Sequence, residues 1–145
     1  MQGVYKAYEG ACHCGALSYR YETALPPEQW PVRACQCSFC RLHAALTTSD
    51  PAGALRFLAG DPGSLQRYRF GARTTDFLIC RRCGSYVGAS VDTTGARFGL
   101  INLRTLQATS LELPEPVMMN YDAESAAARA ARRAARWTPL APQSL

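Results

Sequence analysis

Hydrophobic and polar residues alternate over several short stretches of the chain, which is the pattern of half-buried β-strands. The alternation is regular where Leu17, Tyr19 and Tyr21 are separated by Ser18 and Arg20. Residues two apart on a strand lie on the same face, so these three large side chains are expected to point into a core. The segment is predicted to be a strand.

Two β-hairpins are expected further along. Residues 54–59 alternate and are followed by a Gly-Asp-Pro-Gly turn, so we expect them to pair with residues 64–70. A second hairpin is expected between residues 85–91 and 96–103, around Asp-Thr-Thr-Gly. The fold class predicted from these patterns is mainly β.

The last part of the chain has a different pattern. After Pro114 and Pro116, a segment rich in alanine and arginine runs from 123 to 137, with Asp122 as the expected N-cap. We expect one α-helix there. Four arginines, spaced so that they share one face, make either a solvated surface or a ligand- or partner-binding stripe: Arg129, Arg132, Arg133 and Arg136.

Length and composition indicate one globular domain. The chain has 145 residues, of which 48% are hydrophobic and 19% charged. No apolar run approaches the roughly 18 residues of a membrane span, and residues 1–10 lack a signal-peptide core. We therefore expect a cytoplasmic protein. The seven cysteines are clustered, which favours metal binding or thiol chemistry over disulfides.

The net charge of +5 has two readings. Basic chains often bind nucleic acid, but the basic residues here are scattered. Seven zinc-bound thiolates with two zinc ions would also lower the net charge to about +2. We therefore do not expect nucleic acid to be the partner.

Four cysteines form two pairs that are each followed by glycine. They are Cys12 and Cys14, before Gly15, and Cys80 and Cys83, before Gly84. Glycine after the second ligand lets the backbone turn tightly while its amides point at sulfur. Two such pairs make the four-thiolate set of a closed structural zinc site.

The other three cysteines, Cys35, Cys37 and Cys40, fall within six residues. They can reach one metal ion and leave a tetrahedral site one ligand short, which is characteristic of catalytic zinc. Two alternatives are that His43 or His13 closes the site, and that the thiols are reactive without metal.

The ordered motifs C-x-C-G, C-x-C-x-x-C and C-x-x-C-G resemble those of the glutathione-dependent formaldehyde-activating enzyme (GFA) family, also called the centromere protein V/GFA domain family. The resemblance covers about residues 4 to 107. It implies a β-tent-like fold of packed antiparallel sheets with a C-terminal α-helix outside the shared core. The expected division is a GFA-like zinc-binding domain at 1–113 and a C-terminal extension at 114–145, packed on that domain.

The resemblance also implies a chemistry. Cys12, Cys14, Cys80 and Cys83 match structural zinc ligands, and Cys35, Cys37 and Cys40 match active-site zinc ligands. The implied protein is a carbon–sulfur lyase similar to S-hydroxymethylglutathione synthase, with two Zn²⁺ per chain, a glutathione-like thiol and a small aldehyde. Candidate partners for glutathione carboxylates are Arg41, Arg67, Arg69 and Arg73.

Some positions depart from the family pattern, and two other functions stay open. Ala44 stands where the family commonly has glycine, and Ile79 and Gln107 also differ. These differences leave the cysteine motifs intact and affect the expected pocket. The alternatives are a non-catalytic zinc module for a macromolecular partner, because the GFA domain also occurs in centromere protein V, and methionine sulfoxide reduction, which shares only the fold.

Overall fold

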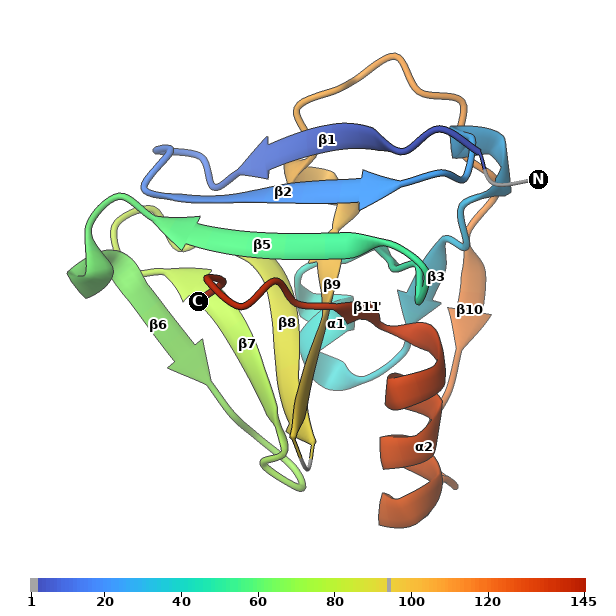
Figure 1. The fold of residues 1–145 in the computed structure, drawn as a ribbon. Helices are drawn as coiled ribbons and strands as arrows, with labels where there is room; N and C mark the ends of the chain where they lie inside the picture. The colour runs from blue at the N-terminus through green and yellow to red at the C-terminus, as the bar shows by residue number, and fades with distance from the viewer. Residues whose placement is uncertain (1–2, 94) are drawn as a thin grey trace.

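The computed structural model describes residues 3–93 and 95–145, and its strands form two sheets (Figure 1). The smaller sheet has the order β1-β2-β5, and the larger has the order β10-β3-β4-β9-β8-β7-β6, with β11 paired to β9. All of these pairs are antiparallel except β10 with β3. The strands are β1 (Lys6–Ala11), β2 (Leu17–Thr23), β3 (Arg33–Cys35), β4 (Thr47–Thr48), β5 (Ala54–Ala59), β6 (Leu65–Tyr68), β7 (Thr75–Cys80), β8 (Tyr86–Thr93), β9 (Ala96–Asn102), β10 (Val117–Met119) and β11 (Thr138–Pro139).

Two α-helices and three short 3₁₀ turns complete the fold. The helices are α1 (Ser38–Leu42) and α2 (Ala126–Arg136), and the turns are η1 (Pro27–Gln29), η2 (Pro62–Ser64) and η3 (Leu103–Thr105). The prediction of a mainly β protein of antiparallel sheets with a C-terminal helix is confirmed. Among the helices described, none is long and apolar enough to cross a membrane.

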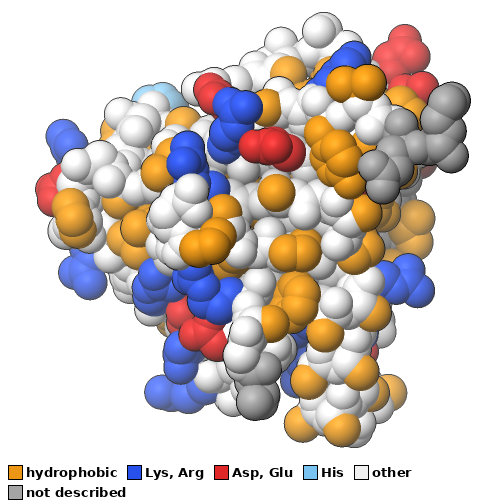
Figure 2. Space-filling model, viewed as in Figure 1, with side chains coloured by type: hydrophobic (Ala, Val, Ile, Leu, Met, Phe, Trp, Pro, Cys, Tyr) orange, Lys and Arg blue, Asp and Glu red, His pale blue; other side chains and the backbone are white. Residues whose placement is uncertain are grey.

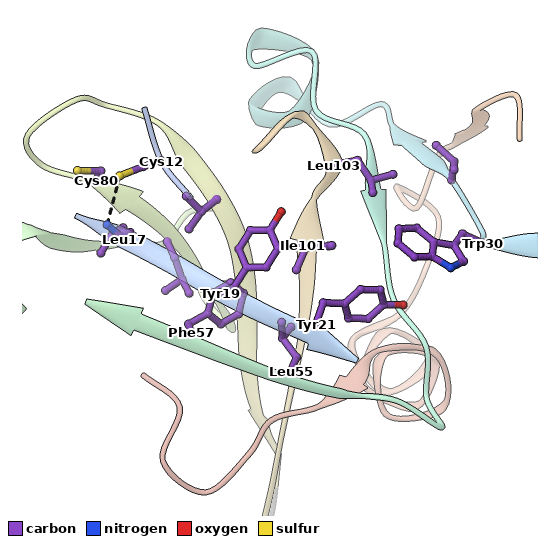
Figure 3. Close-up of a cluster of buried hydrophobic side chains, with 13 residues drawn as sticks. Cys12, Leu17, Tyr19, Tyr21, Trp30, Leu55, Phe57, Cys80, Ile101 and Leu103 are labelled. Atoms are coloured by element: carbon purple, nitrogen blue, oxygen red, sulfur yellow. Dashed lines mark hydrogen bonds between the residues drawn. The ribbon is translucent and has the colours of Figure 1, made fainter. Parts of the chain in front are cut away.

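The main hydrophobic core lies between the two sheets (Figure 3). The predicted strand is confirmed as β2, and Leu17, Tyr19 and Tyr21 are each at most 1% exposed. They pack with Leu55 and Phe57 of β5, and the larger sheet contributes Leu78, Val87 and Ile101. The alternation in β2 therefore reflects a strand that has one face in the core, and its polar residues face away from the core.

The first predicted hairpin is wrong. Residues 54–59 form β5, but β5 pairs with β2, whereas β6 pairs with β7 in the other sheet. The Gly-Asp-Pro-Gly turn contributes to η2, where the Asp61 carboxylate accepts a hydrogen bond from Gly63 N–H, and carries the chain from one sheet to the other. The turn was recognised correctly, but a turn does not determine which sheet receives the next strand.

The second predicted hairpin is confirmed as β8 and β9. The pairing continues to Thr93 and Ala96, closer to the turn than expected, and Thr94 lies outside the described residues. Residues 86 to 91 of β8 are all buried. Val87 faces the small sheet, whereas Tyr86 and Ala89 belong to clusters that include residues of α1 and the Trp137 side chain. The larger sheet is therefore covered on both faces.

The C-terminal helix is confirmed, with corrected ends. It starts after Ser125, whose hydroxyl accepts a hydrogen bond from Ala128 N–H at 3.1 Å, and not after Asp122. Trp137 is its C-cap and not part of the helix. Both residues are good N-cap types, so the sequence alone did not separate them. The residues beyond α2 run along β9 and β5, where Ala141 N–H donates to Leu55 O at 2.9 Å.

Ala44 has a left-handed backbone, with φ of 49°. It follows α1, and its N–H donates to Arg41 O while Ala45 N–H donates to Cys40 O, which is a Schellman motif. Glycine adopts this conformation without the steric cost that a Cβ brings.

We expect Ala44→Gly to raise the free energy of unfolding by roughly 0.5–1 kcal/mol, because it removes that strain at the end of α1. The measurement is urea unfolding of the zinc-loaded protein. Ala52→Gly is the control, since Ala52 is an exposed turn residue with an ordinary φ, and it should be neutral or slightly destabilising. Equal effects of the two substitutions would contradict the strain assigned to Ala44.

Candidate metal centres

Four cysteines from two turns converge at one end of the main core. Cys12 and Cys14 come from the turn between β1 and β2, Cys80 is the last residue of β7, and Cys83 lies in the turn between β7 and β8. Their sulfur atoms all lie within 4.8 Å of one another, with Cys14 Sγ 3.7 Å from Cys12 Sγ and 3.6 Å from Cys80 Sγ. Four sulfurs at about 2.3 Å from a tetrahedral zinc are about 3.8 Å apart, so the spacing fits a zinc ion.

The backbone of both turns is bent as their glycines suggest. Gly15 has φ of 83° and Gly84 has φ of 80°, both in the region that glycine tolerates best. Backbone amides point at sulfur: Leu17 N–H donates to Cys12 Sγ at 3.2 Å (Figure 3), and Arg82 N–H donates to Cys80 Sγ at 3.4 Å. Such donors stabilise thiolates, so the turns are suited to a metal.

The thiols of this cluster differ in burial and in pKa. Cys12 is 4% exposed, and burial raises its pKa to about 11, assisted by the thiols of Cys80 and Cys83. Burial also acts to raise the pKa of Cys83, but hydrogen bonds from the Ser85 hydroxyl and backbone overcome it and lower the pKa to about 5. A cation is needed to hold the buried thiols ionised together.

The other three cysteines meet at α1. Cys35 lies at the end of β3, Cys37 is the N-cap of α1, and Cys40 is in its first turn. Their sulfur atoms also lie within 4.8 Å of one another. Cys37 Sγ accepts the hydrogen bond from Cys40 N–H at 3.4 Å, so the cap of the helix and the cluster are the same feature. This set can also hold a metal ion.

Neither histidine joins a cysteine cluster in the described part of the chain. The His43 ring packs on Phe39, with centroids 4.4 Å apart, and against Tyr86. His13 is exposed, and its backbone N–H donates to the Ser85 hydroxyl. The three-cysteine cluster thus has one protein ligand fewer than a closed tetrahedral site.

The three thiols also share protons strongly. Hydrogen bonds from Cys35 and Cys40 lower the pKa of Cys37 to about 2. The same contacts, with Cys35 first and then Cys37, raise the pKa of Cys40 far above its usual range. The three thiols therefore interact too strongly to ionise together without a cation, so metal binding is expected to release protons.

A cavity of about 290 Å³ opens onto the three-cysteine cluster. All three cysteines line it, together with an apolar wall from the larger sheet, the loop before β7 and the C-cap of α2: Phe70, Phe77, Tyr86, Ala89, Leu100 and Trp137. The volume is at the low end for sites that hold small molecules. The four-cysteine cluster does not line this cavity.

The arginines of the cavity differ from those expected. Of the four candidates, only Arg73 lines it; Arg67 and Arg69 pair with Asp76, and Arg41 is exposed. The other lining arginines are Arg33, which sequence reasoning missed, and Arg129, Arg132 and Arg133, whose shared face it left open between a solvated surface and a binding stripe. The helical spacing of the last three was visible in the sequence, but nothing in it showed which way that face points.

Comparisons with known proteins agree with these motifs. The profile of the glutathione-dependent formaldehyde-activating enzyme family matches residues 7–123. A Halomonas elongata protein, provisionally named as a glutathione-dependent formaldehyde-activating enzyme, is 31% identical over 84 residues. That match covers 53% of this chain and 52% of the relative, so it spans about half of the relative's length.

A solved structure shares the fold. It is a Rhodobacter sphaeroides protein from a structural genomics programme, 30% identical, with a TM-score of 0.56 over 77% of this chain and 99% of the other. The family profile covers most of the chain and includes all seven cysteines of the two clusters. The chain therefore belongs to the glutathione-dependent formaldehyde-activating enzyme family.

Proposed function

We propose that this protein binds two zinc ions and uses the three-cysteine site to add a small thiol to a small aldehyde. The observation that carries the proposal is that one cluster has four cysteines at one end of the core, whereas the other has three cysteines and lines a cavity. Closed and open ligand sets distinguish structural from catalytic zinc. The family name of the relatives supports glutathione and formaldehyde as the pair.

In this proposal Cys12, Cys14, Cys80 and Cys83 hold the structural ion, and Cys35, Cys37 and Cys40 hold the other. When bound there, zinc supplies an open coordination position at which a thiol is held ionised at neutral pH. The reaction forms a carbon–sulfur bond: the sulfur lone pair attacks the carbonyl carbon, the C=O π electrons move to oxygen, and oxygen takes up the proton that the thiol has lost.

The chain's own residues would position the reactants. Phe70, Phe77 and Trp137 provide an apolar surface that limits water around the reacting carbon. Tyr86 also lines the cavity, and burial raises its pKa well above the usual value, followed by the effect of the three cysteines. Its phenol therefore stays protonated at neutral pH and is able to donate a hydrogen bond to the oxygen of the forming alcohol.

The test is exchange NMR on zinc-loaded protein with glutathione and formaldehyde. We expect the rate of exchange between free glutathione and its hydroxymethyl adduct to rise in proportion to protein concentration. Protein washed with a chelator that removes only the labile ion is the control, and it should return the rate to that of buffer. A rate equal to buffer with both ions bound would overturn the proposal and favour the non-catalytic zinc module.

A further inference from the structure

One helix that lies beyond the family match contributes directly to the cavity. The family profile ends at residue 123, and α2 begins at Ala126. Arg129, Arg132 and Arg133 of this helix nevertheless line the same cavity as the three cysteines. In Figure 1, α2 lies beside β10 and the lower ends of the strands of the larger sheet. A segment outside the common core therefore shapes the pocket of this particular chain.

The three arginines differ from the fourth on the same helix. Arg129, Arg132 and Arg133 are partly buried and spaced so that they share one side of α2. Arg136, one turn after Arg132, is exposed and does not line the cavity. On the face shown in Figure 2, the visible surface of α2 carries mostly small hydrophobic side chains. The arginine face is thus not simply a solvated surface.

The cavity has more positive than negative side chains. Five arginines line it, with Asp122 the single acidic lining residue described. Arg129 and Arg132 share the Glu124 carboxylate, at 3.4 and 2.8 Å, and Arg132 also lies 3.7 Å from the centroid of the Tyr121 ring. One carboxylate for two guanidinium groups leaves positive charge uncompensated at this wall.

Three lining arginines, Arg33, Arg73 and Arg133, have no acidic partner among the described residues. Arg33 donates to the Ser49 hydroxyl at 3.0 Å, and Arg133 donates to the Thr74 hydroxyl at 3.0 Å. The Nε of Arg133 is buried with no hydrogen-bond partner. Buried polar groups are rarely left in this state, because losing water without gaining a partner is costly.

The surroundings of Arg133 confirm this cost. The pKa of Arg133 is lowered to about 10, first by burial and then by the neighbouring Arg132 and Arg129. The group is still charged at neutral pH. An anion bound in the cavity would compensate the buried charge of Arg133 and offset its repulsion by Arg132 and Arg129.

We infer that the arginines of α2, with Arg33, form a binding wall for a carboxylate of the thiol substrate. This inference rests on the proposed function for the site and deepens it by assigning that contact to a helix that lies beyond the family match. Arginine suits the task because its planar group donates two parallel hydrogen bonds to a carboxylate. A net charge of about −1 for zinc with three thiolates is too small to balance five arginines.

The test is calorimetric binding of S-methylglutathione to zinc-loaded protein. This probe keeps the two carboxylates of glutathione but has no thiol, so its binding does not depend on adduct formation. We expect Arg133→Gln to weaken binding by about 10-fold or more, since one charge-assisted hydrogen bond is lost. Arg136→Gln removes the same charge from the exposed face and should change binding by less than about twofold.

Two further measurements keep the result interpretable. The diethyl ester of S-methylglutathione should bind weakly to every variant, and Arg133→Lys, which keeps the charge, should bind between wild type and Arg133→Gln. Far-ultraviolet circular dichroism should show unchanged folding in all variants. Equal weakening by Arg133→Gln and Arg136→Gln, equal binding of acid and ester, or no binding of the acid at millimolar concentration would overturn the inference. Binding without catalysis of thiol addition would instead overturn only the proposed function.

Discussion

A Cys35→Ser variant is expected to keep one of two bound zinc ions and to lose at least about 100-fold of the thiol–aldehyde exchange rate, because a cavity site with two thiolates no longer holds its ion. Cys35 is the better target than Cys37, whose sulfur also caps α1. It lies at the end of β3 and is only partly buried, so serine fits there without disturbing the core. Zinc per chain and exchange NMR are the two measurements.

Two single variants are measured beside it. Cys35→Ala also removes the thiol, and Ser38→Ala is the control that leaves all thiols in place. Both cysteine variants should lose the same ion, whereas Ser38→Ala, which changes a residue between two ligands, should keep both ions. The melting temperature of Cys35→Ser should stay within a few degrees of wild type, since the four-cysteine cluster is untouched. Retention of both ions, or loss of both, would contradict the assignment of separate sites.

A Cys80→Ser variant is expected to lose at least about 3 kcal/mol of unfolding free energy, a large part of the stability of a typical domain. Cys80 is 1% exposed and packs in the main core. Its cluster links the turn after β1 to the turn after β7, which are distant in sequence, so the ion closes a long loop. Urea unfolding in the presence of zinc is the measurement.

Arg82→Ala is the control, since Arg82 lies between the two ligands of the same turn with an exposed side chain. It should change the unfolding free energy by less than about 0.5 kcal/mol. Removal of both ions from wild type should reproduce the loss seen with Cys80→Ser. Unfolding of Cys80→Ser at the wild-type urea concentration would show that the cluster has no structural role.

Local patterns predicted the parts of the fold that depend on neighbours in sequence. The alternation around Tyr19 identified β2, and the sequence around 92–95 identified the turn between β8 and β9. The same reasoning failed for β5 and β6, because the turn between them is compatible with either a hairpin or a change of sheet. Strand partners are chosen by burial of whole faces, which a turn sequence does not encode.

The candidate site shows the same division. The spacing of the cysteines was enough to predict two clusters, because ligands one to three residues apart reach one ion from a single turn. The expected roles of the seven cysteines and the division at residue 113 stay predictions. The pocket arginines were only partly predicted: Arg67 and Arg69 are paired with Asp76, Arg33 was missed, and the arginine face of α2 was left open between a solvated surface and a binding stripe.

The sequence by itself therefore determined the β class, the C-terminal helix and the two groups of cysteines, since each depends on periodicity or spacing over a few residues. Only the tertiary structure decided that one group lies at the end of the core while the other lines a cavity, and that α2 turns Arg129, Arg132 and Arg133 toward it. The physical reason is that a cavity is enclosed by elements far apart in the chain, here β3, β8 and α2, and their relative orientation is set by the packing of all faces at once.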